Sequence, residues 1–201
     1  VEPAELLHSM PVIIERGSVQ IAAMPAARTP EVLAVMKGIY PNLVAARNVL
    51  ETSLNNGNIV VHGPLVLMNA GWIEHTGGQF MIYRDGVTPT VGRAMDAVGD
   101  ERDAVLKAFG IKPSARGSFY EQNKDAAWTR DPCEVGPPDL RHRYISEDVP
   151  FGLVPLAWLG DLAGVSTPIS DAMIDLASLA NRADYRRKGL SLKRLGLGGL
   201  D

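Results

Sequence analysis

The sequence predicts a mainly α-helical protein, in which a helical C-terminal domain is preceded by a short β segment. Most of the 201 residues show apolar side chains at helical spacing, whereas β-branched runs occur only near the start. The pairs Thr88-Pro89 and Thr167-Pro168 each combine a capping residue with proline at the first helical position. We therefore place the domain boundary between a strand-containing segment, 1–42, and an all-helical segment, 43–201.

The first segment contains two short β-branched runs, Pro11–Glu15 and Ser18–Ala23, separated by Arg16-Gly17. These runs predict a hairpin or two edge strands, and a helical pattern follows from Glu31 to Tyr40. Two strands alone do not form a stable sheet. We therefore expect them to belong to a larger sheet, whose other strands lie outside this sequence.

The second segment predicts a series of helices, ordered as Leu43–Leu54, Leu65–His75, Pro89–Phe109, Gly152–Gly164 and a last one from Pro168. Gly110 suits a helix C-terminus, and Gly99 is a position where the third helix can divide. The fourth helix is apolar almost all round, which predicts a buried helix with Pro155 in its first turn.

Composition and charge exclude several classes of protein. The net charge of −3 gives no electrostatic drive toward nucleic acid or an anionic membrane. The uncharged stretch from Thr52 to Ile73 is long enough to span a bilayer, but its four asparagines, His62 and Pro64 favour a protein interior. The single cysteine, Cys133, excludes an internal disulfide, is interpreted as structural and fits a reducing compartment such as the cytoplasm.

The sequence lacks the short motifs of several common kinds of active site. The four histidines lie at positions 8, 62, 75 and 142, without the spacing of a metal site, so we expect no metal. No Gly-rich nucleotide loop follows a strand, and no serine lies in a nucleophile elbow.

Two segments carry candidate chemistry. In the first, Asn55–Pro64, His62 lies near the start of a helix, where an imidazole can act as a general acid and base. The alternative is a histidine that is hydrogen-bonded inside a polar pocket. The asparagines of this segment either orient the ring, contact a ligand or cap the preceding helix, and Asn58 is the candidate for substrate contact.

The second segment, His142–Pro155, is dense in charge and is followed at once by an apolar helix. Arg143 offers a planar fork suited to a carboxylate. Asp148 precedes the next helix, where its carboxylate can accept the second ring proton of a distant histidine. The alternative is an exposed capping cluster with an internal Arg–Asp pair.

Several blocks in order resemble the opine dehydrogenase family. They are N-x-x-x-H followed by L-x-L-M-N-A-G over residues 58–71, F-x-I-Y-x-D-G-V-T-P over 80–89, D-E-R over 100–102, L-R-H-R-Y-I-S-E-D-V-P-F-G-L-V-P over 140–155 and G-V-S-T-P over 164–168. The resemblance covers the chain from about residue 42 to the end. No single block is specific for this family, but the occurrence of all of them in this order is.

The resemblance implies that an N-terminal Rossmann domain joins a helical domain, and that this chain is the latter with the last strands of the former. It implies NADH- or NADPH-dependent reductive condensation of an amino acid with a 2-oxo acid. By position, His62 matches the catalytic histidine, Asp148 its partner and Arg143 an arginine of the substrate pocket. The nucleotide is then expected to bind mainly to the Rossmann domain, without which the chain is expected to be inactive.

Two alternatives remain open. One is a related dehydrogenase that acts on a hydroxy acid, although such sites commonly use a lysine and the stretch from Thr52 to Ile73 has none. The other is a helical dimerisation or binding module without activity. A homodimer is compatible with either, because helical domains with an apolar face often dimerise.

Overall fold

The structure, a computed structural model, describes residues 18–113, 121 and 135–190. The chain forms two compact units, Val1–Thr52 and Ser53–Asp201. This division falls later in the chain than the predicted boundary at residue 42. The predicted mainly helical class is confirmed, because within the described residues only two short strands form a sheet.

The first unit contains a parallel strand pair joined by helices. Its elements are β1 (Val19–Ile21), the 3₁₀ turn η1 (Ala26–Arg28), α2 (Thr29–Met36) and β2 (Leu43–Ala45). Val19 pairs with Leu43 and Ile21 with Ala45. Among the described residues β1 pairs with β2, and a helical crossover makes this pair parallel. The hairpin predicted between β1 and the run that precedes it stays a prediction. The run Pro11–Glu15 lies outside the described residues.

The predicted helix Leu43–Leu54 is wrong in its first part. Leu43–Ala45 is strand β2, and only Val49–Leu54 is helical, as α3. The Ala46 amide donates to the carbonyl of Ile21 at 2.8 Å, which extends the ladder beyond β2. The apolar residues of this segment fit either structure, and pairing with a strand more than twenty residues earlier decides between them.

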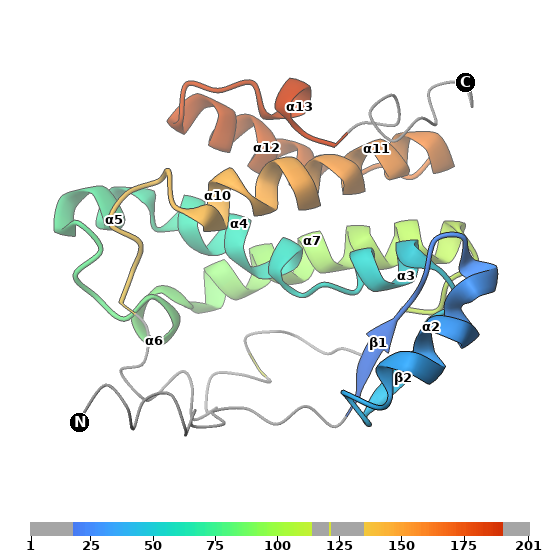
Figure 1. Cartoon of the computed structure of the whole chain (residues 1–201). Helices are drawn as coiled ribbons and strands as arrows, with labels where there is room; N and C mark the ends of the chain where they lie inside the picture. The colour runs from blue at the N-terminus through green and yellow to red at the C-terminus, as the bar shows by residue number, and fades with distance from the viewer. Residues whose placement is uncertain (1–17, 114–120, 122–134, 191–201) are drawn as a thin grey trace, which may run out of the picture. The chain divides into compact units, whose positions relative to one another are not determined.

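The second unit is a helical bundle (Figure 1). Its helices are α4 (Asn58–Met68), α5 (Ala70–Thr76), α6 (Ile82–Gly86), α7 (Pro89–Ala108), α10 (Arg143–Ser146), the π-helical turn η2 (Val149–Leu153), α11 (Val154–Ala163), α12 (Pro168–Ala180) and α13 (Tyr185–Lys188). Helix α4 packs against α7, α10, α12 and η2, and it is therefore the centre of the bundle. Leu65 and Val66 of α4, Met95 and Val98 of α7 and Ile174 of α12 are fully buried there.

The two Thr-Pro signals correctly predict where α7 and α12 begin, but the two helices are capped differently. The Thr88 hydroxyl accepts a hydrogen bond from the Val91 amide at the start of α7. At α12 the cap comes from Glu101 of α7, whose carboxylate accepts hydrogen bonds from the amides of Ile169 and Ser170 at 2.7 and 2.8 Å. A carboxylate at a helix N-terminus is favoured by the unsatisfied amides there. Helix α7 also continues unbroken through Gly99.

Close packing of η2 on α4 fixes the spacing of the segments that carry the candidate site. Gly152 of η2 lies against Ile59 of α4, and a Cβ at Gly152 would overlap the Ile59 side chain. We expect Gly152→Ala to lower the free energy of unfolding by about 1–3 kcal/mol, the usual cost of overpacking. Urea unfolding measures it. Gly71→Ala in α5 is the control, since nothing lies near its Cβ position; an equal loss in both variants would contradict close packing as the cause.

Candidate active site

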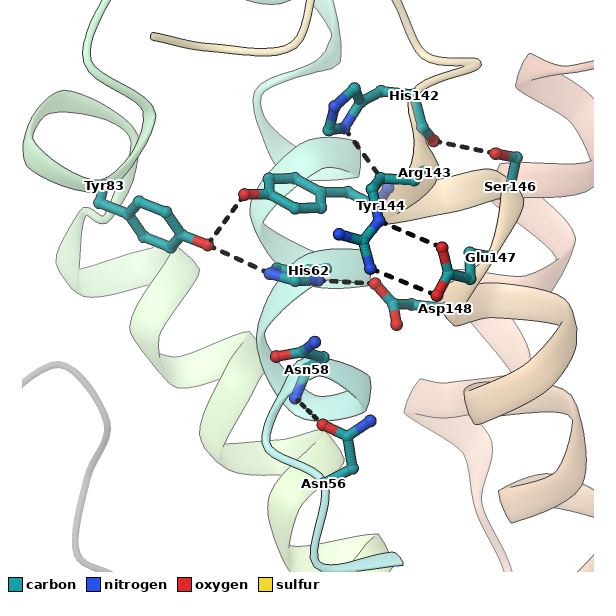
Figure 2. Close-up of polar contacts among 10 residues, drawn as sticks. All are labelled: Asn56, Asn58, His62, Tyr83, His142, Arg143, Tyr144, Ser146, Glu147 and Asp148. Carbon is teal, nitrogen blue, oxygen red and sulfur yellow. Dashed lines mark hydrogen bonds and ion pairs between the residues drawn. The ribbon is translucent and has the colours of Figure 1, made fainter. Parts of the chain in front are cut away.

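His62 and Asp148 form a buried pair, although 86 residues separate them in the sequence. Nδ1 of His62 lies 2.6 Å from Oδ2 of Asp148. Their relative exposures are 6% and 8%. Figure 2 shows the imidazole on α4 in line with the carboxylate. The structure thus brings together the two residues that the sequence proposed as a catalytic pair.

Local structure places each member of this pair. His62 lies in the second turn of α4, which begins after Gly57, and the Asn58 amide there donates to the Asn56 side chain at 3.1 Å. Asp148 immediately precedes η2, which continues directly into α11.

The carboxylate determines which imidazole nitrogen is available for chemistry. Because an ionised carboxylate only accepts hydrogen bonds, Nδ1 of His62 carries a proton and donates it to Asp148. The other nitrogen, Nε2, lies 3.1 Å from the hydroxyl of Tyr83 on α6. With Nδ1 protonated, the neutral ring has its lone pair at Nε2, which faces the Tyr83 hydroxyl.

Tyr144 of α10 covers one face of the imidazole. Its ring stacks on His62 with centroids 3.8 Å apart and planes at 18°. His142 contacts Tyr144 edge-on at 4.6 Å, and its Nδ1 accepts a hydrogen bond from the Tyr144 amide at 3.4 Å. The Tyr144 and Tyr83 hydroxyls lie 3.3 Å apart. The ring of His62 is thus fixed by one carboxylate, one hydroxyl and one stacked aromatic ring.

Arg143 lies beside this pair with an exposed side chain. Its Nε and Nη2 groups donate to the two carboxylate oxygens of Glu147 at 3.1 and 3.3 Å, one helical turn away. The hydrogen bond to Glu147, with a smaller contribution from the charge of Asp148, raises the pKa of Arg143 above its usual value. The alternative of an internal Arg–Asp pair is therefore corrected, because the ion-pair partner of Arg143 is Glu147. Spacing of four residues on a helix is the physical reason.

Asn58 lies one helical turn before His62 on α4 and is exposed. Residues four apart share a helix face, so Asn58 and His62 lie on the same side of α4 (Figure 2).

Three members of this site were not identified from sequence: Tyr83, Tyr144 and Glu147. All three stand inside the blocks that carry the family resemblance. The four-residue spacing of Arg143 and Glu147 is a local signal that predicts their pairing. Tyr83 and Tyr144 have no such signal, because their partners lie on other helices.

Within the described ranges, no group of three or more His, Cys, Asp or Glu side chains is arranged to hold a metal ion. The helices in the same ranges include none with the length and apolar character needed to cross a membrane. Cys133 lies outside the described residues.

Comparison with known proteins agrees with the sequence resemblance. A family model described as "NAD/NADP octopine/nopaline dehydrogenase, alpha-helical domain" matches residues 45–181. An opine dehydrogenase from Arthrobacter sp. (strain 1C) is 36% identical over 199 residues, which cover 92% of this chain and 54% of the relative.

Solved structures of octopine dehydrogenase share the fold. The structure with NADH and L-arginine matches with a TM-score of 0.58 at 19% identity, over 84% of this chain and 54% of that chain. The structure with NADH and pyruvate matches with a TM-score of 0.57 at 18% identity, over 84% and 52%. This chain thus spans about half the length of the proteins it matches. Because the family model covers more than half of the sequence, the chain belongs to the family of the NAD/NADP octopine/nopaline dehydrogenase alpha-helical domain.

Proposed function

We propose that this chain supplies the acid–base and substrate-binding half of an NAD(P)H-dependent opine dehydrogenase. The proposed reaction joins the amine of an amino acid to the carbonyl carbon of a 2-oxo acid and reduces the resulting imine. The observation that carries the proposal is the buried His62–Asp148 pair with Arg143 beside it. Family membership and the amino acid and oxo acid bound by octopine dehydrogenase support the substrate classes.

The imidazole is suited to the proton transfers of this condensation. The amine nitrogen forms a bond to the oxo carbon, and the oxo oxygen must take up protons before it leaves as water. His62, when protonated at Nε2, is the source of a proton for that oxygen, and when neutral it takes up a proton released by the attacking amine. Asp148 holds the Nδ1 proton throughout and stabilises the imidazolium.

Arg143 is suited to bind a substrate carboxylate, which both substrates carry. Its guanidinium is exposed and presents a planar fork that matches a carboxylate in two hydrogen bonds. Glu147 pairs with the Nε and Nη2 edge of the guanidinium and orients it, and the edge formed by Nη1 and Nη2 is the one that we assign to the substrate carboxylate. Asn58 offers amide donor and acceptor groups on the same side of α4 as His62.

The residues of the candidate site are suited to transfer protons, whereas they supply no hydride. NAD(P)H, when bound, supplies the hydride that reduces the imine carbon. Neither β1 nor β2 is followed by a Gly-rich turn into a helix, the feature that cradles a dinucleotide pyrophosphate. We therefore assign the nucleotide mainly to a Rossmann-type domain, of which segment 1–42 is the last part, and segment 43–201 to substrate binding and catalysis. Strand β2 (Leu43–Ala45) lies just past this boundary and completes the βαβ unit of the first segment.

The proposal extends to the setting of the enzyme. A single cysteine favours a reducing compartment, so we propose the cytoplasm. The proposed holoenzyme consists of this chain together with its Rossmann-type domain. We also propose that helical domains of two copies can associate as a homodimer.

The test of the proposed function measures NAD(P)H oxidation by the holoenzyme with pyruvate and a panel of amino acids. We expect oxidation only when amine and oxo acid are both present. The product mass should equal the sum of the two substrates minus one oxygen atom, because water leaves and two hydrogens are gained. Oxidation that continues without any amine would instead show a hydroxy-acid dehydrogenase. No oxidation with any pair would favour a binding module.

A further inference from the structure

A chain of hydrogen-bonding groups connects His62 to two tyrosines from different helices. Nε2 of His62 lies 3.1 Å from the Tyr83 hydroxyl of α6, and that hydroxyl lies 3.3 Å from the Tyr144 hydroxyl of α10. Figure 2 shows both hydroxyls turned toward the same side of the imidazole. The nitrogen that exchanges a proton in the proposed mechanism is therefore in contact with a hydroxyl group.

The two hydroxyls can serve either charge state of His62. When the ring is neutral, Tyr83 donates to the lone pair of Nε2, and Tyr144 donates to the Tyr83 oxygen. When the ring is protonated, Nε2 donates to the Tyr83 oxygen, and Tyr83 donates its own proton onward. A phenol hydroxyl can donate one hydrogen bond while its oxygen accepts another, so the direction of the chain can reverse without movement of heavy atoms.

The structure holds Tyr83 at this position. The buried Asn69 side chain at the end of α4 donates to the carbonyl of Leu65 at 2.8 Å and to that of Gly86 in α6 at 3.0 Å. At the other end of α6, the Asp85 carboxylate accepts a hydrogen bond from the Met81 amide at 3.0 Å. Helix α6 is thereby fixed to the helix that carries His62.

The two tyrosines differ in burial, and this difference suggests different roles. Tyr144 is 7% exposed and stacks on the imidazole, whereas Tyr83 is only partly buried. Of the two hydroxyls, that of Tyr83 is therefore the one that a bound molecule can reach. Tyr144 is buried and contacts both His62 and Tyr83, so it can orient both side chains.

We propose that Tyr83 relays the proton between His62 and the substrate oxygen, and that Tyr144 is a positioning residue for both; this inference rests on the proposed function. In the relay, the Nε2–H bond of His62 breaks as an O–H bond forms on Tyr83. The former O–H bond of Tyr83 breaks as its proton bonds to the substrate oxygen. One proton leaves the imidazolium and one reaches the substrate, so Tyr83 ends as a neutral phenol and no oxidant or reductant is needed.

The experiment compares Tyr83→Phe and Tyr144→Phe with wild-type holoenzyme and with Tyr185→Phe. Tyr185 is also buried, and its hydroxyl accepts one hydrogen bond, from Asn181, outside the site. Each phenylalanine variant therefore loses one hydroxyl and keeps the aromatic ring. Thermal unfolding of each variant reports whether it is folded.

We expect Tyr83→Phe to lower kcat by about 10–100-fold, less than the roughly 10²–10⁴-fold of a full acid–base group because His62 remains, with the KM of the oxo acid unchanged. Tyr144→Phe should lower kcat less, and Tyr185→Phe should leave it unchanged. In mixtures of H₂O and D₂O, kcat of the wild type should depend on more than one exchanged proton, and kcat of Tyr83→Phe on a single one. A merely structural hydroxyl would not change that dependence.

Two results would overturn the relay. If wild type is active and folded Tyr83→Phe keeps kcat within twofold of Tyr185→Phe, the relay is wrong while the proposed function stands. The same holds if both enzymes show the same proton dependence. If wild type shows no amine-dependent turnover, the proposed function fails, and the relay fails with it.

Discussion

His62→Asn is expected to lower kcat of the holoenzyme by about 10²–10⁴-fold, the range for a positioned acid–base group. Asparagine keeps a hydrogen-bonding amide at this position of α4 and can donate to Asp148, but it has no proton to transfer near neutral pH. Removal of the imidazole also removes the surface on which Tyr144 stacks. The rate of amine-dependent NAD(P)H oxidation at saturating substrates measures the effect.

The loss must be separated from unfolding, because the hydrogen-bond partner of the buried Asp148 carboxylate is being replaced, and removal of the partner of a buried charge can cost about 3–5 kcal/mol. Urea unfolding of the variant gives the fraction of folded protein during the assay. His75→Asn is the matched control, since His75 is exposed on α5 and lies outside the site. A decrease in kcat of less than about tenfold in folded His62→Asn would remove His62 from the acid–base role.

The helix starts illustrate how much of the fold the sequence carries. The Thr88-Pro89 and Thr167-Pro168 signals are local, because proline fixes its own φ angle and lacks the amide that the first turn leaves unpaired. Both predict helix starts that the structure confirms. The strand Leu43–Ala45 was missed because its conformation depends on pairing with β1, which no local pattern encodes.

In the candidate site, contacts within one helix can likewise be predicted from sequence, whereas contacts between distant elements cannot. The Arg143–Glu147 pair follows from spacing on one helical turn. The contact between His62 and Asp148 joins α4 to the start of η2, and only the packing of those elements creates it. The pairing of His62 with Asp148 was predicted from the resemblance to a known family, because no local pattern of residues predicts it. It did not supply a role for Tyr83, whose hydroxyl meets His62 only because Asn69 fixes α6 to α4.

Asp148→Asn is expected to lower kcat by about 10²–10⁴-fold as well, although it changes the shape of the site very little. If the asparagine amide group donates to Nδ1 of His62, the ring is forced into the other neutral tautomer, and Nε2 loses its lone pair. If the asparagine oxygen accepts from Nδ1 instead, the tautomer is kept, but the carboxylate charge that stabilises the imidazolium is lost. Either orientation impairs proton exchange at Nε2.

Asp148→Asn distinguishes two roles of Asp148: orientation of the His62 ring and packing between α4 and η2. Asparagine retains a hydrogen bond to His62, so we expect a small change in the free energy of unfolding, of about 1 kcal/mol. The matched control is Asp139→Asn, where an exposed carboxylate accepts a hydrogen bond from the Arg141 amide. A large loss of kcat with nearly unchanged stability and an unaffected control means that the charge of Asp148 acts through His62. Equal rates for Asp148→Asn and Asp139→Asn would mean instead that the buried pair serves only to hold α4 against η2.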